Sequence, residues 1–376
     1  MIYLDNNATT AVDEQVLEAM LPYFREKFGN ASSNLHTQGW IAKDAVEQAR
    51  LIIADSIACT PQEIVFTSGA TEALNTAIIG VYNAYHSKGN HIVTIQTEHN
   101  AVLDTCKYLA QKGADITYLK VDKNGQIDLN ELENSITNNT VLVAAMLVNN
   151  ETGVILPIKE ISKIVHQKNS ILCCDTTQAF GKMPINVDDF GIDLMSISGH
   201  KFYAPKGVGA LYIRRKNPRV TIEALLHGGG HENGKRSGTL NVPGIVALGK
   251  ATQIAYENLL QNTTHISSMR NLLENKFEEL LENKIEIVGK NTSRIYNTSN
   301  IIFPTKSENI IKRIKHKIAI STGSACTSAE NKPSHVLKAM DYSDLQAQSA
   351  LRFSIGKYNT LDDIHQTIQL FKEIDL

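Results

Sequence analysis

The chain has 376 residues, of which 42% are hydrophobic and 20% are charged, and this composition is typical of a folded globular protein. A chain of this length exceeds what one simple core usually organises, so we expect two domains. The formal net charge is −2, and no apolar run approaches the roughly 18 residues of a membrane helix, so we expect neither a membrane partner nor direct binding of nucleic acid.

The N-terminal part begins with a polar, Asn-rich arm at residues 1–12, which lacks the charged and apolar regions of a secretion signal. Helical periodicity follows at residues 14–28 and again at residues 41–58. The segment between them, residues 29–39, is rich in turn formers and predicts a loop.

A regular alternation of strands and helices begins at residue 63 and predicts an α/β fold, with a mostly parallel sheet flanked by helices. The apolar runs that predict strands are residues 64–67, 91–96, 116–121, 141–148, 171–174, 193–197 and 207–214. The helical patterns between them are residues 71–86, 101–112, 129–136 and 158–168.

The C-terminal third predicts a smaller α+β domain, joined to the first by a long helix at about residues 245–261. Its other predicted elements are helices at 265–282, 308–316 and 361–372, and strands at 285–288, 298–303, 318–322 and 351–355. We therefore expect a large domain at residues 13–258 and a small domain formed by residues 1–12 and 259–376.

Polar side chains follow five of the predicted strands, at the sheet edge where folds of this kind bind ligands. The last such group offers Ser198, Gly199 and His200 as donors suited to a phosphate, followed directly by Lys201. Taken alone, Lys201 is more typical of a solvated surface residue. A lysine beside a phosphate site can, however, form a Schiff base with a phosphorylated aldehyde, pyridoxal 5′-phosphate (PLP).

The five cysteines are scattered and form no CxxC pair, which indicates reduced thiols in a cytoplasmic protein rather than disulfides or a structural zinc. Cys326 lies in a small, polar stretch at residues 321–333, which predicts an exposed, mobile loop and indicates a nucleophile. Its thiol would need help to deprotonate, because its ordinary pKa is about 8.5. The other four lie in apolar patterns typical of a core: Cys59, Cys106, Cys173 and Cys174.

We expect no metal site. His227 and His231 have the spacing of a helical metal-binding pair. Three glycines lie between them, however, and disfavour a helix there.

Ten motifs in order along the chain resemble those of PLP-dependent cysteine desulfurases of fold type I, in the group typified by NifS and IscS. The resemblance covers nearly the whole chain and implies a PLP fold type I architecture and a homodimer. The motifs are YLDNNATT at 3–10, GNASS at 29–33, TSGATE at 67–72, TEH at 97–99, NNE at 149–151, DTTQ at 175–178, SGHK at 198–201, RSGT at 236–239, GSACTS at 323–328 and RFS at 352–354.

The resemblance also implies a role for each site residue. Lys201 would bind PLP covalently, Asp175 would pair with its pyridine nitrogen, and His99 would lie on the ring face and assist proton transfers. Arg352, with help from Asn30, would bind the substrate carboxylate. The remaining implied contacts are those of Asn150 and Gln178 with the ring 3-oxygen, and those of Ala70, Thr71, Ser198, His200 and, from the other subunit, Thr239 with the phosphate.

The implied activity converts L-cysteine to L-alanine and leaves a persulfide on Cys326 for a sulfur-acceptor protein. The acceptor pathway stays open between iron–sulfur cluster assembly, including a nitrogenase-type system, and sulfur modification of tRNA or DNA, as in DNA phosphorothioation. Relatives that supply the general iron–sulfur scaffold carry a C-terminal docking extension, whereas this sequence stops at Leu376. We therefore expect a dedicated partner.

Three other functions remain as alternatives. Another fold-type-I PLP enzyme, such as an aminotransferase or a selenocysteine lyase, would need no Cys326. A PLP-binding regulator would need a DNA-binding module, for which we find no room before Tyr3. A pure sulfur carrier would need neither Lys201 nor a phosphate site, so the presence of both Cys326 and Lys201 favours the desulfurase.

Overall fold

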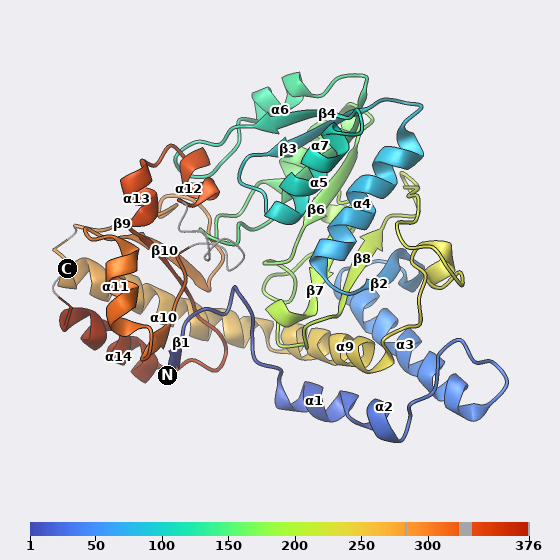
Figure 1. Ribbon diagram of the computed structural model, residues 1–376, viewed down its shortest axis with the longest axis horizontal. Coiled ribbons are helices and arrows are strands. Elements are labelled where there is room, and N and C mark those ends of the chain that lie inside the picture. Colours follow the sequence, from blue (N-terminus) through green and yellow to red (C-terminus); the bar gives the residue numbers. More distant parts are fainter. Residues whose placement is uncertain (283, 323–332, 375–376) are drawn as a thin grey trace.

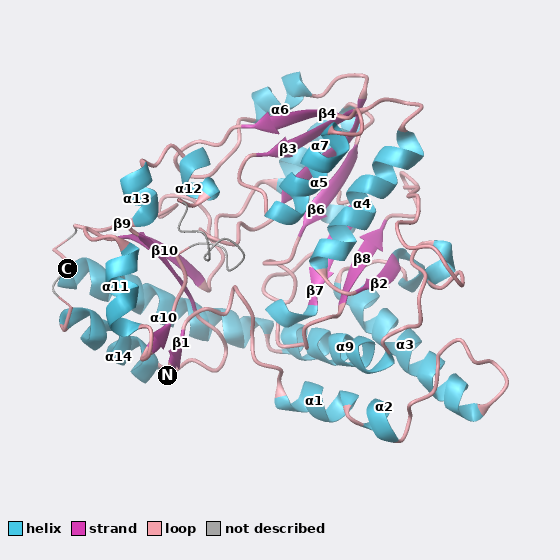
Figure 2. Cartoon of the chain, in the orientation of Figure 1, coloured by secondary structure: helices cyan, strands magenta, loops and turns pink. Residues whose placement is uncertain are grey.

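A seven-stranded sheet, in the order β2-β8-β7-β6-β5-β3-β4, forms the centre of the computed structural model, which describes residues 1–282, 284–322 and 333–374 (Figures 1 and 2). β8 is antiparallel to both of its neighbours, and the other neighbouring strands are parallel. The predicted mostly parallel α/β sheet is therefore confirmed. The strands are β2 (Ile64–Thr67), β3 (His91–Ile95), β4 (Asp115–Leu119), β5 (Thr140–Met146), β6 (Ile171–Asp175), β7 (Leu194–Ser198) and β8 (Gly209–Ile213).

Helices cover both faces of this sheet, so its central strands are buried on both sides. Every residue of β5 is buried, which explains why its sequence after Thr140 is an apolar run rather than an alternation. One face packs against α4 (Ala70–Tyr85) and α5 (Asn100–Ala110). The other face packs against α3 (Thr37–Ser56), α7 (Ile158–Gln167) and α9 (Val242–Glu257).

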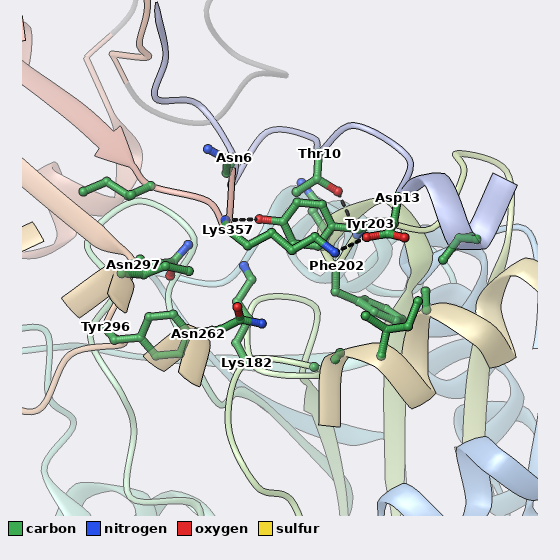
Figure 3. Close-up of a pocket in the computed structure, with 18 residues that line it drawn as sticks. Asn6, Thr10, Asp13, Lys182, Phe202, Tyr203, Asn262, Tyr296, Asn297 and Lys357 are labelled. Carbon is green, nitrogen blue, oxygen red and sulfur yellow. Dashed lines mark hydrogen bonds and ion pairs between the residues drawn. The ribbon is translucent and has the colours of Figure 1, made fainter. Parts of the chain in front are cut away.

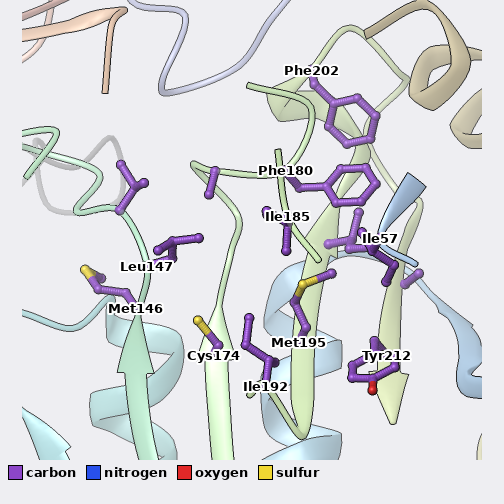
Figure 4. Close-up of a cluster of buried hydrophobic side chains, with 14 of the residues drawn as sticks. Ile57, Met146, Leu147, Cys174, Phe180, Ile185, Ile192, Met195, Phe202 and Tyr212 are labelled. Carbon is purple, nitrogen blue, oxygen red and sulfur yellow. The ribbon is translucent and has the colours of Figure 1, made fainter. Parts of the chain in front are cut away.

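The core on the α9 side contains the aromatic pair Phe180 and Phe202, whose ring centroids lie 5.1 Å apart (Figure 4). Of the four cysteines predicted to be core residues, the three at positions 106, 173 and 174 are buried. Cys59 is only half-buried, because it lies in the turn that follows α3. The core prediction is therefore met only in part for this thiol, which packs against the core from its edge.

The large sheet is accompanied by shorter helices that differ from the prediction in two places. The helix predicted at 14–28 is divided into α1 (Glu14–Met20) and α2 (Pro22–Arg25), where Pro22 occupies the first turn of the second helix. α8 (Val187–Phe190) was not predicted, because four residues are too few to show a helical period. The predicted α6 is present at Leu129–Ser135.

The C-terminal part has its own small antiparallel sheet, in the order β12-β10-β9, and a parallel pair formed by β1 and β11. The strands are β1 (Ile2–Tyr3), β9 (Glu286–Ile287), β10 (Thr298–Ile302), β11 (Ile318–Ala319) and β12 (Ala350–Ser354). The helices are α10 (Leu259–Leu280), α11 (Ser307–Ile314), α12 (His335–Ala339), α13 (Asp344–Gln348) and α14 (Leu361–Lys372).

A separate hydrophobic cluster supports this part of the chain. Phe277 contacts Phe371 and Phe353, with ring centroids 4.8 and 5.4 Å apart, and Leu4 of the N-terminal arm joins the same cluster. α10 follows α9 directly, with the non-helical Asn258 between them, so the helix predicted at residues 245–261 ends at Glu257 and the next helix begins at Leu259 rather than at residue 265 (Figure 1). Within the described ranges no helix is both long and apolar enough to cross a membrane.

Candidate active site

Ten predicted site residues line one cavity of about 400 Å³ at the carboxyl edge of the central sheet. Nine of them lie at or just after the ends of β2, β3, β5, β6 and β7, and Arg352 lies on β12 of the C-terminal part. Parallel strands end at a common edge, which is why segments distant in sequence converge here. The ten are Ala70, Thr71, His99, Asn150, Asp175, Gln178, Ser198, His200, Lys201 and Arg352.

The N-terminus of α4 forms one wall of the cavity, with Ala70 and Thr71 in its first turn. Gly69 precedes them with φ 153°, a conformation that favours glycine, and no side chain caps the helix. The first N–H groups of a helix have no intrahelical partner, so they are available to an anion. Ser198 and His200 line the same cavity, and together these donors fit a phosphate group.

Lys201 ends a short 3₁₀ turn, Gly199–Lys201, that follows β7. Its Nζ donates to the carbonyl oxygens of Asn7 and Ala8, at 2.6 and 2.9 Å. Both carbonyls belong to the N-terminal arm, for which the sequence predicted a family motif but no place in the site. The arm therefore holds the lysine that the sequence singled out.

Asp175 ends β6 and is buried. Its Oδ1 accepts hydrogen bonds from Ser196 Oγ at 2.7 Å and from the backbone N–H of Thr177 at 2.9 Å. Because both described donors bind the same oxygen, Oδ2 remains for a cationic partner in the cavity.

Two histidines of the cavity are held neutral. His99 caps α5, and its Nδ1 accepts from the backbone N–H of Ala101 at 3.1 Å, which places the ring proton on Nε2. Burial lowers the pKa of His99, although the Asp175 carboxylate opposes this shift. Burial, followed by the charge of Lys201, lowers the pKa of His200 to about 4.

Arg352 lies on β12 and is fully buried. Its Nη1 donates to the Asn150 carbonyl at 2.9 Å and its Nη2 donates to Asp5 Oδ1 at 2.8 Å, so two segments fix the guanidinium plane. Arg352 Nε and Asn150 Oδ1 are buried without a hydrogen-bond partner in the described part of the chain. Both residues line the cavity, so a ligand with carboxylate and hydroxyl groups would satisfy them.

Three predicted site residues are not among those that line the cavity. Thr239 and Asn30 are exposed on loops elsewhere on the chain, and Asn30 Oδ1 accepts from the backbone N–H of Ser32 at 2.9 Å. Cys326 lies outside the described residues. Their roles therefore stay predictions.

The cavity also contains an ion pair that was not predicted from the sequence. Glu72 lines the cavity in the first turn of α4, and its Oε1 accepts from Arg236 Nε at 2.7 Å. Although burial opposes the shift, this hydrogen bond lowers the pKa of Glu72. The pairing neutralises a carboxylate that would otherwise repel an anion at this helix end. Arg236 belongs to the RSGT motif, which is the one sequence feature that could have pointed to this ion pair.

Comparison with known proteins places this site in a family. The model for class-V aminotransferases matches residues 2–367, and the chain belongs to that family, which implies PLP as cofactor. The sequence is 47% identical over 370 residues to cysteine desulfurase IscS of Rickettsia massiliae (strain Mtu5), covering 98% of this chain and 90% of that protein. Within its family the chain is a cysteine desulfurase of the IscS and NifS kind, as the motifs predicted.

Solved structures agree with this assignment. A NifS-like protein superposes with a TM-score of 0.92 at 38% identity, covering 99% of this chain and 98% of that chain. The structure titled SspA in complex with cysteine has a TM-score of 0.83 at 35% identity, covering 96% of this chain and 100% of that one. The predicted PLP fold type I architecture is confirmed, and cysteine is supported as the substrate.

Proposed function

We propose that this enzyme holds PLP at Lys201, converts L-cysteine to L-alanine and retains the sulfur as a persulfide on Cys326. The observation that carries the proposal is the convergence of Lys201, Asp175 and Arg352 with the open helix end of α4 on one cavity. A phosphorylated pyridine aldehyde and an amino-acid carboxylate require these four kinds of partner. The role of Cys326 rests on the sequence motif.

Four residues of the cavity would each have a separate role in the reaction. Bound there, PLP supplies an electron sink for the pair left behind when the α-proton of cysteine is removed. Lys201 Nζ would carry the cofactor and, as a free amine, would take that proton. Asp175 would keep a negative charge beside the pyridine nitrogen, and neutral His99 would donate or accept protons at Nε2. Arg352 would orient the substrate through its carboxylate.

The remaining cavity contacts bind the cofactor without taking part in proton transfer. They are the helix end at Ala70 and Thr71 with Ser198 and His200 for the phosphate, and Asn150 and Gln178 for the ring 3-oxygen.

Sulfur would leave the substrate by attack of the Cys326 thiolate on the cysteine sulfur. In this step the bond between Cβ and sulfur breaks and a sulfur–sulfur bond forms on Cys326. The electron pair of the broken bond stays on carbon, where a proton adds at Cβ to form the methyl group. The proton held by Lys201 Nζ would return to Cα and complete alanine, so no external oxidant or reductant is required. The persulfide is then available to an acceptor thiol.

We also propose the assembly that the sequence predicted. A large domain at residues 13–258 and a small domain of residues 1–12 and 259–376 are supported by the separate cluster around Phe277, which Leu4 joins. A homodimer in which Thr239 completes the phosphate site of the other subunit, and Asn30 assists Arg352, would give both exposed residues a function.

The acceptor is proposed to be a sulfur-carrying partner protein of iron–sulfur assembly or of tRNA or DNA modification, in the cytoplasm. The four described cysteines are free thiols, as a reducing compartment would maintain them.

Borohydride reduction of the PLP-loaded protein, followed by peptide mapping, tests the proposed function. We expect one reduced link, at Lys201, and none in Lys201→Ala. Lys206 lines the same cavity and is the matched control, since Lys206→Ala should still be labelled at Lys201. Covalent labelling that survives in Lys201→Ala would place the cofactor on another residue and refute the assignment.

A further inference from the structure

A second lysine, Lys182, is buried behind the cavity in the turn that follows β6. Lysines are almost never fully buried unless they are paired with a carboxylate. The charged groups that influence Lys182 are two cations, Lys201 and Arg352. Burial, followed by these two charges, lowers the pKa of Lys182 to about 7.

Lys182 lies on the wall of a separate small cavity of about 30 Å³, which is room for about one water molecule (Figure 3). The other charged groups on this wall are Lys201, Lys357 and Asp13, and the last two pair with each other. Tyr203 also lines it, with a pKa that burial raises to about 12, so it stays neutral. Among the described lining residues, no carboxylate is left to neutralise Lys182.

A chain of hydrogen bonds joins the two lysines. Lys182 Nζ donates to Gln178 Oε1 at 2.8 Å, and Gln178 Nε2 donates to the Asn7 carbonyl at 3.1 Å. Lys201 Nζ donates to that same carbonyl at 2.6 Å. Protonated Lys182 can only donate, so in that form Gln178 must turn its oxygen toward Lys182 and its NH₂ group toward the Asn7 carbonyl. The orientation of this amide is therefore fixed by Lys182.

We propose that Lys182 is a positioning residue of the PLP site, which orients Gln178 and whose positive charge favours the uncharged amine of Lys201. The proposal rests on the proposed function, because it assumes that Lys201 carries the cofactor. A lysine attacks an aldehyde only as the free amine, and a neighbouring cation lowers the pKa of an amine. Because the pKa of Lys182 is itself about 7, this effect on Lys201 acts at pH values up to about 7, where Lys182 still carries its charge.

The hydrogen-bond chain sets the size of the expected effect. Three hydrogen bonds and one amide group separate the two nitrogens, so they lie at most about 11 Å apart. At the effective dielectric constant of about 20 that suits protein interiors, one charge at this distance shifts a pKa by about one unit.

The test follows the absorbance of bound PLP against pH in the native protein and in two variants. Lys182→Met removes both the charge and the donor, whereas Lys182→Gln removes the charge and keeps a donor. In both, the midpoint of the absorbance change should rise by about one pH unit, because a cation no longer opposes a proton at Lys201. Lys163→Met, which changes an exposed lysine on α7, is the control and should keep the native midpoint.

A second measurement separates orientation from charge. PLP should dissociate roughly tenfold faster from Lys182→Met, because Gln178 loses a charge-assisted hydrogen bond and is free to turn. Lys182→Gln should release PLP at nearly the native rate, and it serves as the informative variant if the methionine protein does not fold.

Three results have different consequences. An unmoved midpoint in both variants overturns the role of charge, and native PLP release from a folded Lys182→Met overturns the role in orientation. If Lys201→Ala still forms a reducible link to PLP, the proposed function itself is refuted. The proposed role of Lys182 is then refuted as well, because it assumes that Lys201 carries PLP.

Discussion

Replacing Asp175 with asparagine tests the charge contact on which the proposed chemistry depends. Asparagine has the same shape and keeps one oxygen to accept from Ser196 Oγ and the Thr177 N–H, so the fold at the end of β6 should be retained. The change is confined to the second carboxylate oxygen, which becomes an uncharged NH₂ group. Losing one preorganised charge contact costs about 3 kcal/mol or more, which is roughly a hundredfold in rate.

The assay is alanine formation from L-cysteine, with PLP content measured on the same sample. We expect Asp175→Asn to retain PLP and to lose about a hundredfold or more in kcat. Ser196→Ala is the graded control, because it removes one donor to the carboxylate and should cost only about tenfold. An Asp175→Asn enzyme within about threefold of the native rate would show that another group stabilises the charged ring nitrogen.

The sheet could be predicted from sequence because its strands are short, mainly apolar runs that alternate with helical patterns. β5 and β6 are buried along their whole length, and their only polar residues, Thr140 and Asp175, stand at strand ends and do not interrupt the apolar run. The antiparallel direction of β8 could not be predicted this way, since apolar periodicity carries no information on strand direction. α12 and α13 have five residues each, too few for a helical period, and they were missed.

The sequence could predict those site residues whose side chains lie at the ends of strands, because the ends of predicted strands mark the ligand-binding edge of the sheet. Asp175, at the end of β6, and Lys201, just after β7, are two examples. Asn7 and Ala8 act through backbone carbonyls, which the sequence does not distinguish from any others. Lys182 resembles a surface lysine in sequence, and only the structure shows that it is buried against Gln178.

The remaining predictions concern substrate binding, stability and sulfur transfer. Arg352→Lys should keep PLP but raise KM for cysteine about tenfold or more in steady-state assays, because lysine lacks the fork that binds a carboxylate; an unchanged KM would place the carboxylate site elsewhere. Glu232→Gln should lower the free energy of unfolding in urea by about 3 kcal/mol, since it breaks a buried pair with Arg50 at 2.8 Å; a change below about 1 kcal/mol would contradict this. Burial lowers the pKa of His200 to about 4 from an ordinary 6.5, so the unfolded chain binds more protons between these values. The free energy of unfolding should therefore fall as the pH falls from about 6.5 to about 4, and it should fall less steeply in His200→Gln. The same slope in both proteins would show that His200 does not cause this loss of stability. Cys326→Ala should abolish persulfide and alanine formation, while the spectral change on adding cysteine to the PLP-loaded protein survives. That separation follows because substrate binding needs Lys201 and Arg352, whereas sulfur removal needs the thiol. Alanine and sulfide release at the native rate would make Cys326 a bystander and favour a selenocysteine-lyase-like enzyme.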